Sequence, residues 1–458
     1  MRWPGKIVLW VLWSVAPLLA SLPERLYTAE NYDVGINADL AGQRLYGEAR
    51  ITLHSHASFQ ISALELDAGG LQISSVVEGN SPQWFERNRN LLFITLTNPL
   101  RSNEQRTLTI RYQAGPAPGL KFFPDQIYAS NASDWMPCND RPGERATLHL
   151  TIAAPSDRTV VASGQLIATH SADKQNVTEW QLDAPAEPSW FGFALGAFVE
   201  GASDAGSVKV RVLGTTAQLF EPTAAAIRYL SERSGKPYPG AAYTQVFVHG
   251  DVIHPMAAGL TLLPESYARE LEKQPDNLWL LTSALAHQWY GLGIAPKDWS
   301  ELWLSDGISG FLADAFLGQR FGKERFDREM QHSRQIYNEL RAEGKDRALS
   351  DAGWTTRQEA AGDVPLHKGA WFLYQVNQLV GEAAFEEGLR LYTSGQWGHA
   401  ATSEDLQKAF AAAGGSAAKK SAAPEAKSNR KAKGRDGETT LDNLFDLWVY
   451  GMLVTKSK

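Results

Sequence analysis

The stretch from Leu281 to Gly307, LTSALAHQWYGLGIAPKDWSELWLSDG, holds two side chains that could bind a metal ion, His287 and Asp306. A zinc-binding helix often carries His-Glu-x-x-His, because two imidazoles one turn apart hold the metal while the Glu activates its water. The window that ends at His287 reads SALAH, with Ser283 at the place of the first His and Ala284 at that of the Glu. A serine hydroxyl stays protonated near neutral pH and is a poor zinc ligand. The spacing is therefore that of a zinc site, but two of the residue types are not.

Ser283 and His287 also have the one-turn spacing that a serine nucleophile and a histidine base could use. However, the sequence around Ser283 lacks the Gly-x-Ser-x-Gly turn that exposes such a serine, and no oxyanion hole can be identified. We therefore set serine hydrolysis aside. Simpler roles exist for both candidate ligands. A hydrogen-bonded histidine in an amphipathic helix explains His287, and an N-cap explains Asp306, which stands directly before a helical pattern.

Helices must position these residues. Apolar residues recur at helical spacing over residues 277–292 and again over 307–321, which predicts two amphipathic helices with His287 on the first. Further helical runs lie at 324–340 and 369–379. The C-terminal part of the chain is therefore expected to be mainly helical.

The chain from about residue 25 to residue 200 has a different pattern. Apolar and polar residues alternate in short segments that Gly, Pro, Asn and Asp separate, which is typical of antiparallel strands. The segments are EARITLHS, NLLFITLTN, RTLTIRYQAG, ATLHLTIAAP and RTVVASGQ. The sequence thus predicts a multidomain α+β protein, with an N-terminal antiparallel β domain followed by a mainly helical domain.

Composition supports a globular protein. The chain has 458 residues, of which 43% are hydrophobic and 21% charged, so it can bury a large core and form two or three domains. Its net charge of −7 argues against a general nucleic-acid binder, and we expect no nucleic-acid partner. The single cysteine, Cys138, allows no internal disulfide.

Two segments differ in composition from the globular part of the chain. Residues 1–22 contain Arg2 and Lys6 followed by an apolar run from Ile7 to Ala20, the pattern of a signal peptide, but no clear cleavage site follows, so an N-terminal anchor is the alternative. We therefore expect a protein that is exported, with a periplasmic, extracellular or membrane-anchored location and membrane association through its N-terminus. Residues 414–438, rich in Ala, Ser and Lys, are expected to form a disordered basic insertion between two helices.

Several segments occur together in the order of one known family. They are DWMPCNDRPGERATLHLTIAAP, WFGFALGAF, GKPYPG, MAAGLTLLPES, AHQWYG, DWSELWLSDG and LHKGAWFLYQV. In these segments the chain resembles the gluzincin aminopeptidases, the group that contains aminopeptidase N and leukotriene hydrolase, over most of residues 25–455. The resemblance implies an N-terminal β saddle domain at 23–200 and a thermolysin-like metallopeptidase domain at 201–458.

The resemblance also assigns the chemical positions. The family's three zinc ligands fall on Ser283, His287 and Asp306, the last after the family's eighteen intervening residues, and its catalytic base falls on Ala284. The tyrosine that would stabilise the oxyanion, in the family's Tyr-x-Lys-Gly, falls on Leu366.

The family's exopeptidase motif, Gly-x-Met-Glu-Asn, falls on HPMAAGL with one residue missing. Its glutamate, which would hold the amine of the substrate, has no counterpart at Met256, Ala257 or Ala258. These three residues are therefore the remains of a substrate-binding motif.

These replacements affect one reaction. Loss of the base and loss of the oxyanion donor each typically reduce the rate by about 10²-fold or more. The resemblance therefore predicts an aminopeptidase-like pseudoenzyme without a cofactor, which binds a peptide or protein partner in its vestigial cleft. The alternative is an active metallo-aminopeptidase or hydrolase whose zinc site is rebuilt. Its ligands would come from His254, His287, Asp306 and His367.

Overall fold

The computed structural model of this chain describes residues 25–172, 174–215, 219–354, 356–414 and 440–452. The expected signal peptide or anchor at 1–22 lies outside these residues, and so does the expected basic insertion at 414–438 apart from Gly414. None of the helices in the described ranges combines the length and the apolar character that crossing a membrane requires.

The N-terminal half consists of strands, as the alternating pattern predicts. In β11 every second residue is buried, including Leu148, Leu150 and Ile152, because successive side chains of a strand point to opposite faces. The elements are β1 (Tyr27–Asp39), β2 (Arg44–Ser55), β3 (Ile61–Asp67), β4 (Gln72–Glu78), β5 (Ser81–Pro82), β6 (Trp84–Asn88), β7 (Leu91–Leu100), β8 (Gln105–Ala114), β9 (Leu120–Phe122), β10 (Gln126–Ala129), η1 (Ala132–Asp134), β11 (Ala146–Pro155), β12 (Thr159–Ala162), β13 (Gln165–Ala172), β14 (Gln175–Ala186), η2 (Pro188–Trp190) and β15 (Phe193–Gly196).

These strands form one long sheet and two smaller ones. The long sheet has the order β13-β14-β11-β1-β2-β8-β4-β5, and the smaller sheets have the orders β3-β7-β6 and β12-β15-β10-β9. Neighbouring strands pair antiparallel, with the exception of β1 and β11, which pair in parallel. The predicted, mainly antiparallel β domain is confirmed.

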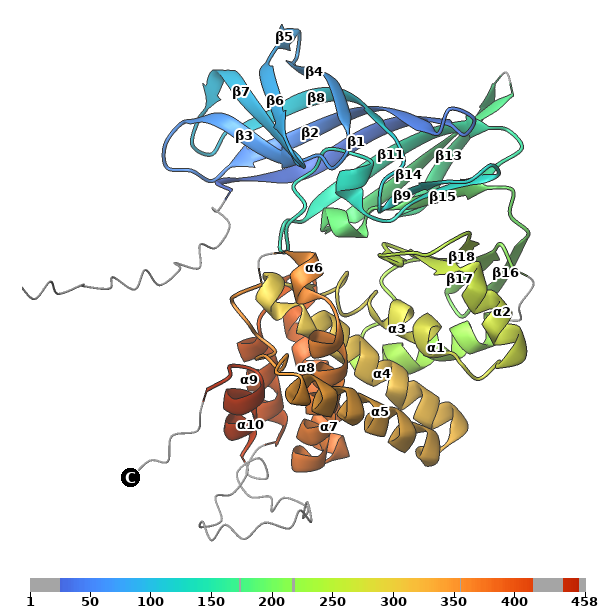
Figure 1. The fold of residues 1–458 in the computed structure, drawn as a ribbon, viewed down its shortest axis with the longest axis vertical. Coiled ribbons are helices and arrows are strands. Elements are labelled where there is room, and N and C mark those ends of the chain that lie inside the picture. The colour runs from blue at the N-terminus through green and yellow to red at the C-terminus, as the bar shows by residue number, and fades with distance from the viewer. Residues whose placement is uncertain (1–24, 173, 216–218, 355, 415–439, 453–458) are drawn as a thin grey trace, which may run out of the picture.

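The second half combines a mixed sheet with helices. The sheet has the order β16-β17-β18-β20-β19, and most of the helices lie on the side away from the β domain, whereas α6 lies next to that domain (Figure 1). The elements are β16 (Glu200–Ala205), β17 (Val208–Leu213), α1 (Phe220–Ser234), β18 (Ala242–Val248), β19 (Met256–Ala257), β20 (Leu260–Pro264), α2 (Glu265–Lys273), α3 (Trp279–Ala286), β21 (Ala295–Pro296), η3 (Trp299–Glu301), α4 (Trp303–Phe321), α5 (Lys323–Ala342), α6 (Arg357–Ala360), the π-helical turn η4 (Val364–Lys368), α7 (Gly369–Val380), α8 (Glu382–Gln396), β22 (Ala400–Ala401), α9 (Ser403–Gly414) and α10 (Leu441–Trp448).

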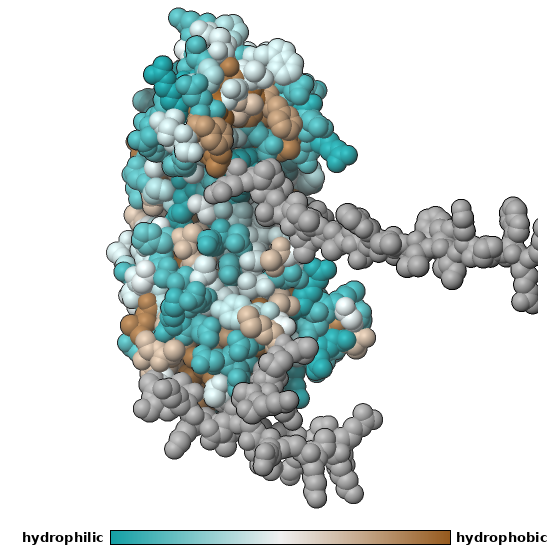
Figure 2. All heavy atoms as spheres, turned by 90° about the vertical axis from the view of Figure 1, so that its left-hand side faces the viewer, coloured by the Kyte–Doolittle hydropathy of each residue, from teal (hydrophilic) through white to brown (hydrophobic). Residues whose placement is uncertain are grey.

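The mixed sheet joins the two halves of the molecule. Along β18, Val246 packs into the core of the β domain, whereas its neighbour Phe247 packs into the core of the helical domain. Leu262 and Leu263 of β20 divide in the same way. Figure 2 shows that hydrophilic residues cover most of one outer face, with hydrophobic patches between them, the most visible on the β domain.

The helix around His287 is shorter than the pattern predicts. The prediction over 277–292 is wrong at its C-terminal end, because α3 stops at Ala286 and His287 is its C-cap. Beyond His287 the backbone hydrogen bonds join residues five apart, for example from the amide of Leu292 to the carbonyl oxygen of His287. Gly291 has φ +146°, and a Cβ there would lie 2.5 Å from the Trp190 side chain, so close packing against the β domain ends the helix.

The helix that carries Asp306 is longer than predicted. It begins at Trp303, four residues before the expected start at 307, so Asp306 lies in the first turn of α4 and is not its N-cap. That correction removes the simplest explanation for this carboxylate, although a negative charge in the first turn still interacts favourably with the helix dipole. The helices predicted at 324–340 and 369–379 are confirmed as α5 and α7.

Candidate functional site

The structure brings His287 and Asp306 together at the junction of α3 and α4. Nε2 of His287 lies 3.2 Å from Oδ1 of Asp306, and the two side chains are 7% and 19% exposed. Nδ1 of His287 lies 2.7 Å from the carbonyl oxygen of Ser283, which only accepts, so Nδ1 carries a proton. Tetrahedral zinc with bonds of about 2.1 Å would separate two ligand atoms by about 3.4 Å. The pair therefore keeps the spacing of two zinc ligands while its atoms bond to each other.

The rest of the donor set does not fit zinc. Ser283 and Ala284, to which the resemblance assigns the positions of the first ligand and the base, are buried on α3 and offer a neutral hydroxyl and a methyl group. Among the described residues, no three His, Cys, Asp or Glu side chains form a group that could hold a metal ion. One imidazole and one carboxylate are fewer than the three protein ligands that catalytic zinc takes. These residues therefore do not support a zinc-dependent step.

The residue that the resemblance assigns to the position of the oxyanion donor has an apolar side chain. Leu366 lies in η4, and its Cδ1 atom packs against Gly310 of α4. A Cβ added at Gly310 would lie 2.9 Å from this Cδ1 atom. A leucine donates no hydrogen bond, so it offers no support to a developing negative charge.

Two of the three residues that the resemblance assigns to the exopeptidase motif are packed against the β domain. Ala257 and Ala258 are buried in the core of the β domain, and the amide of Ala258 donates to the carbonyl of Trp190 at 2.9 Å. Met256, partly exposed in β19, is the member of the three that has surface to offer to a ligand.

Sequence reasoning missed the residue that fixes this motif against α3. Gln288 is fully buried, its Nε2 donates to the carbonyl of Ala257 at 2.9 Å, and its Oε1 accepts from the amide of Gly259 at 2.9 Å. It stands directly after His287, and that adjacency is the signal that could have pointed to it. Gln288 thus ties the end of α3 to β19 and β20.

The four ligands of the expected rebuilt site do not converge. His254 lies close enough to Asp306 to interact with it electrostatically, and burial together with Arg357 lowers the pKa of His254 to about 3. His367 is directed to α5, where its Nδ1 lies 3.2 Å from Oγ of Ser333. Burial lowers the pKa of His367 as well.

A second group of charges missed by sequence reasoning lies between the β domain and α6. Glu187 is buried at the start of η2 and accepts from the amide of Gly143 at 2.7 Å. Burial raises the pKa of Glu187 to about 7, and burial beside Asp67 raises that of Asp140 to about 6. Arg357 of α6 interacts electrostatically with both carboxyls. These residues are far apart in sequence, so only the fold reveals the group.

An N-terminal β domain followed by a mainly helical domain is the arrangement that the resemblance to two-domain metallopeptidases implies. The sequence profile of the Peptidase M1 N-terminal domain matches residues 28–189, and that of the Peptidase family M1 domain matches residues 221–424. The chain belongs to peptidase family M1, and its resemblance to the gluzincin aminopeptidases is confirmed.

Relatives and solved structures agree with this assignment. The chain is 22% identical to aminopeptidase Ey of Gallus gallus over 71% of its own length and 38% of the relative's. It is also 22% identical to probable aminopeptidase 1 of Sulfurisphaera tokodaii, over 77% of its own length and 48% of the relative's. The chain thus spans less than half of the length of these relatives.

Among solved structures, a mutant M1 zinc metallopeptidase from Deinococcus radiodurans superimposes with a TM-score of 0.74. The match covers 94% of this chain and 96% of that one, at 22% identity. At this level of identity, the likeness shows a shared fold.

Proposed function

We propose that this chain is a pseudoenzyme of the M1 family, which binds a peptide or a peptide segment of a protein in the cleft beside His287 without cleaving it by the zinc mechanism. The carrying observation is that Ser283, Ala284 and Leu366 occupy the positions of a zinc ligand, the base and the oxyanion donor. These groups act as a unit with the metal, so their combined loss removes the reaction.

Peptide binding is supported by the fold and by the contacts that hold β19 in place. The Deinococcus radiodurans protein has also been solved with a Tyr-Ser-Ala substrate bound, so a chain of this fold can hold a tripeptide. In the present chain, Gln288 keeps β19 fixed against α3, and Met256 remains partly exposed beside it. A cleft of the same architecture can therefore persist after the catalytic groups are gone.

Export is a second proposal about this chain. It rests on Arg2, Lys6 and the apolar run from Ile7 to Ala20, which lie outside the described residues. A fusion of residues 1–40 to a reporter that is active only outside the cytoplasm should give signal, and a silent reporter would refute export.

We expect no zinc-dependent hydrolysis by the wild-type chain. The test is the release of a fluorophore from a panel of aminoacyl substrates by the purified full-length protein, with and without added zinc. Because the base and the oxyanion donor are both absent, the rate should equal that of an Asp306→Ala variant. A rate that zinc raises and that Asp306→Ala abolishes would mean that the site is catalytic. Failure of fluorescently labelled tripeptides to bind at all would overturn the other half of the proposal.

A further inference from the structure

A buried carboxyl group lines a cavity next to the vestigial site. The cavity measures about 330 Å³ and lies between α3, α4, α5 and η4. Its lining includes Asp314, Glu329, Trp279, His332, His367 and Leu366. The resemblance assigns Leu366 to the family's oxyanion position, and Gly310, also in the lining, lies one helical turn after Asp306 on α4, so the cavity lies beside the vestigial site. Its volume is at the lower end of the range typical of small-ligand sites, about 300–1,000 Å³.

Asp314 is the unusual member of this lining. It is 3% exposed, and its Oδ1 accepts a hydrogen bond from the indole N–H of Trp279 at 2.7 Å. Within the described part of the chain, no hydrogen bond or ion pair reaches its second oxygen, Oδ2. Oδ2 is not among the fully buried unpaired atoms of the described residues, so it keeps some contact with solvent and is available to a ligand.

No cation among the described residues forms an ion pair with Asp314. The guanidinium of Arg325 interacts with Asp314 electrostatically and lowers its pKa in part, but it is paired with Glu329 at 2.5 Å and with Asp276 at 3.0 Å. Burial and the negative charge of Glu329 raise the pKa of Asp314 well above its usual range. The two imidazoles of the lining pack edge to face, with ring centroids 5.4 Å apart. The cavity therefore presents more acid than base.

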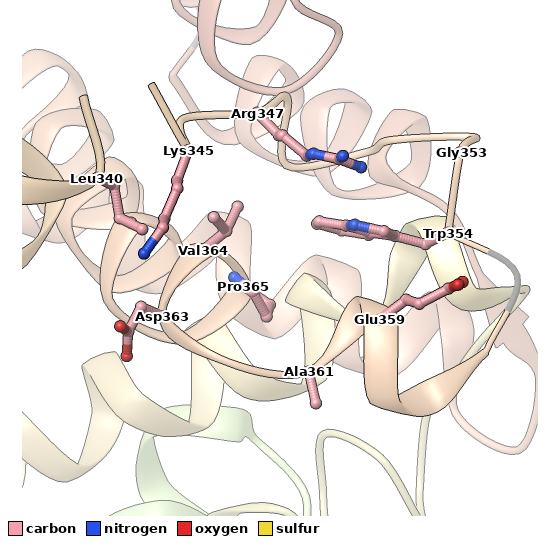
Figure 3. A pocket seen from close by; sticks show the side chains of 10 residues that line it. All are labelled: Leu340, Lys345, Arg347, Gly353, Trp354, Glu359, Ala361, Asp363, Val364 and Pro365. Carbon is pink, nitrogen blue, oxygen red and sulfur yellow. The ribbon is translucent and has the colours of Figure 1, made fainter. Parts of the chain in front are cut away.

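Another cavity of the helical domain shows the contrast. It measures about 420 Å³ and has both basic and acidic side chains in its lining, including Lys345 and Arg347 (Figure 3). Lys345 pairs with Glu343 at 2.7 Å, and Arg347 pairs with Asp351 at 3.4 Å. Both basic side chains of this cavity thus have an acidic partner within the protein. Asp314, by contrast, forms no ion pair with any described residue.

We propose that the cavity at Asp314 receives the side chain of a lysine or arginine residue of the bound peptide, with the carboxylate of Asp314 as its counter-ion. The inference rests on the proposed function, because the peptide must lie in the cleft for its side chain to enter. An ammonium or guanidinium group would satisfy Oδ2 with a charge-assisted hydrogen bond. The ring of Trp279 and the side chain of Leu366 would contact the methylene stem.

The position of Asp314 suits this role. Asp306, Gly310 and Asp314 follow one another at intervals of four residues, so they share one face of α4. Eight residues of helix correspond to about 12 Å, which places Asp314 two turns beyond the vestigial ligand pair. A long side chain extending from a peptide near Leu366 bridges part of that distance, whereas a short side chain does not.

The test compares labelled tripeptides that differ only in lysine, arginine or norleucine at one position, using fluorescence anisotropy with the full-length chain. We expect the cationic peptides to bind about 10-fold or more tightly than the norleucine peptide. Asp314→Asn keeps an acceptor for the indole of Trp279 but cannot lose a proton to become the anion that pairs with the entering cation, so it should reduce this preference to less than about twofold. Glu324→Gln, at an exposed position of α5, makes the same change of charge and should keep the preference.

The other outcomes are equally decisive. Tripeptides that bind equally well with lysine and norleucine would overturn the inference and leave the proposed function standing. Binding of free cadaverine or agmatine to the wild type but not to Asp314→Asn, with no binding of any tripeptide, would support the cavity as a cation site and overturn the proposed function. If Asp314→Asn does not fold, Glu329→Gln serves as the second variant. It releases the guanidinium of Arg325 from Glu329, so that Arg325 competes for Asp314 and the lysine preference should fall, whereas an unchanged preference would count against the inference.

Discussion

Replacing Ser283 with His, Ala284 with Glu and Asp306 with Glu is expected to give the chain a stoichiometric zinc ion. The helix positions are retained, and Nε2 of His287 already lies at ligand-like spacing from the carboxylate at position 306. A third protein ligand should tighten zinc binding by more than about 100-fold, since even outer-shell partners change metal affinity by about 10–100-fold. Competition with a zinc chelator measures this affinity.

The matched control is the same triple variant with alanine in place of histidine at Ser283, which restores the base and the carboxylate but not the first ligand. It should bind zinc as weakly as the wild type does. If the full triple variant binds no better than this control, the surroundings of the site no longer admit a metal, and the retained spacing is a feature of the fold alone.

Repair of the metal site should not restore full activity. The glutamate that would hold the substrate amine is missing around Met256, and Leu366 still provides no donor. Adding Leu366→Tyr to the triple variant should raise residual hydrolysis by about 10²-fold with little change in zinc affinity, because an oxyanion donor acts on the transition state. An equal rise in both quantities would show that the tyrosine acts through the metal site.

Gly307→Ala is expected to lower the free energy of unfolding by about 1–3 kcal/mol, the cost of overpacking a tight contact. Gly307 of α4 faces the start of α7, and an added Cβ would lie 2.9 Å from the carbonyl oxygen of Pro365 and 3.0 Å from Cα of Gly369. These are backbone atoms, so no change of side-chain rotamer relieves the clash. The two segments must separate, and that moves Leu366 away from α4.

The comparison for this variant is Gly395→Ala, in α8, where a Cβ would meet no atom within 4 Å. That change should be neutral or stabilise the chain by up to about 1 kcal/mol, because alanine favours a helix over glycine. Denaturation followed by tryptophan fluorescence measures both effects. Equal stability of the two variants would mean that α4 and α7 are less closely packed than described.

Strands and helices with one buried face can be predicted from the spacing of apolar residues in the sequence. The alternation in residues 146–155 predicts β11, and the helical spacing in residues 324–340 predicts α5, since both depend on which face is buried. The eighteen-residue interval between His287 and Asp306 likewise predicts that the pair meets, because it repeats the family's spacing.

Other features depend on contacts between distant segments and have no local signal. The early end of α3 comes from the packing of Gly291 against Trp190, about a hundred residues away. The contact of Gln288 with Ala257, and the free oxygen of Asp314 in its cavity, depend on how α3, α4 and β19 are placed in space. Helical periodicity places Asp314 on α4 but does not show what it faces.

The zinc content of the purified wild-type chain tests the central claim most directly. The full-length protein, produced without a polyhistidine tag in medium that contains zinc, is dialysed against a weak chelator and measured by mass spectrometry of its metal content. With one imidazole and one carboxylate at the ligand positions, we predict less than about 0.1 zinc per chain, both for the wild type and for Asp306→Ala. About one zinc per wild-type chain, lost in Asp306→Ala, would contradict the account and show that this site still holds its metal.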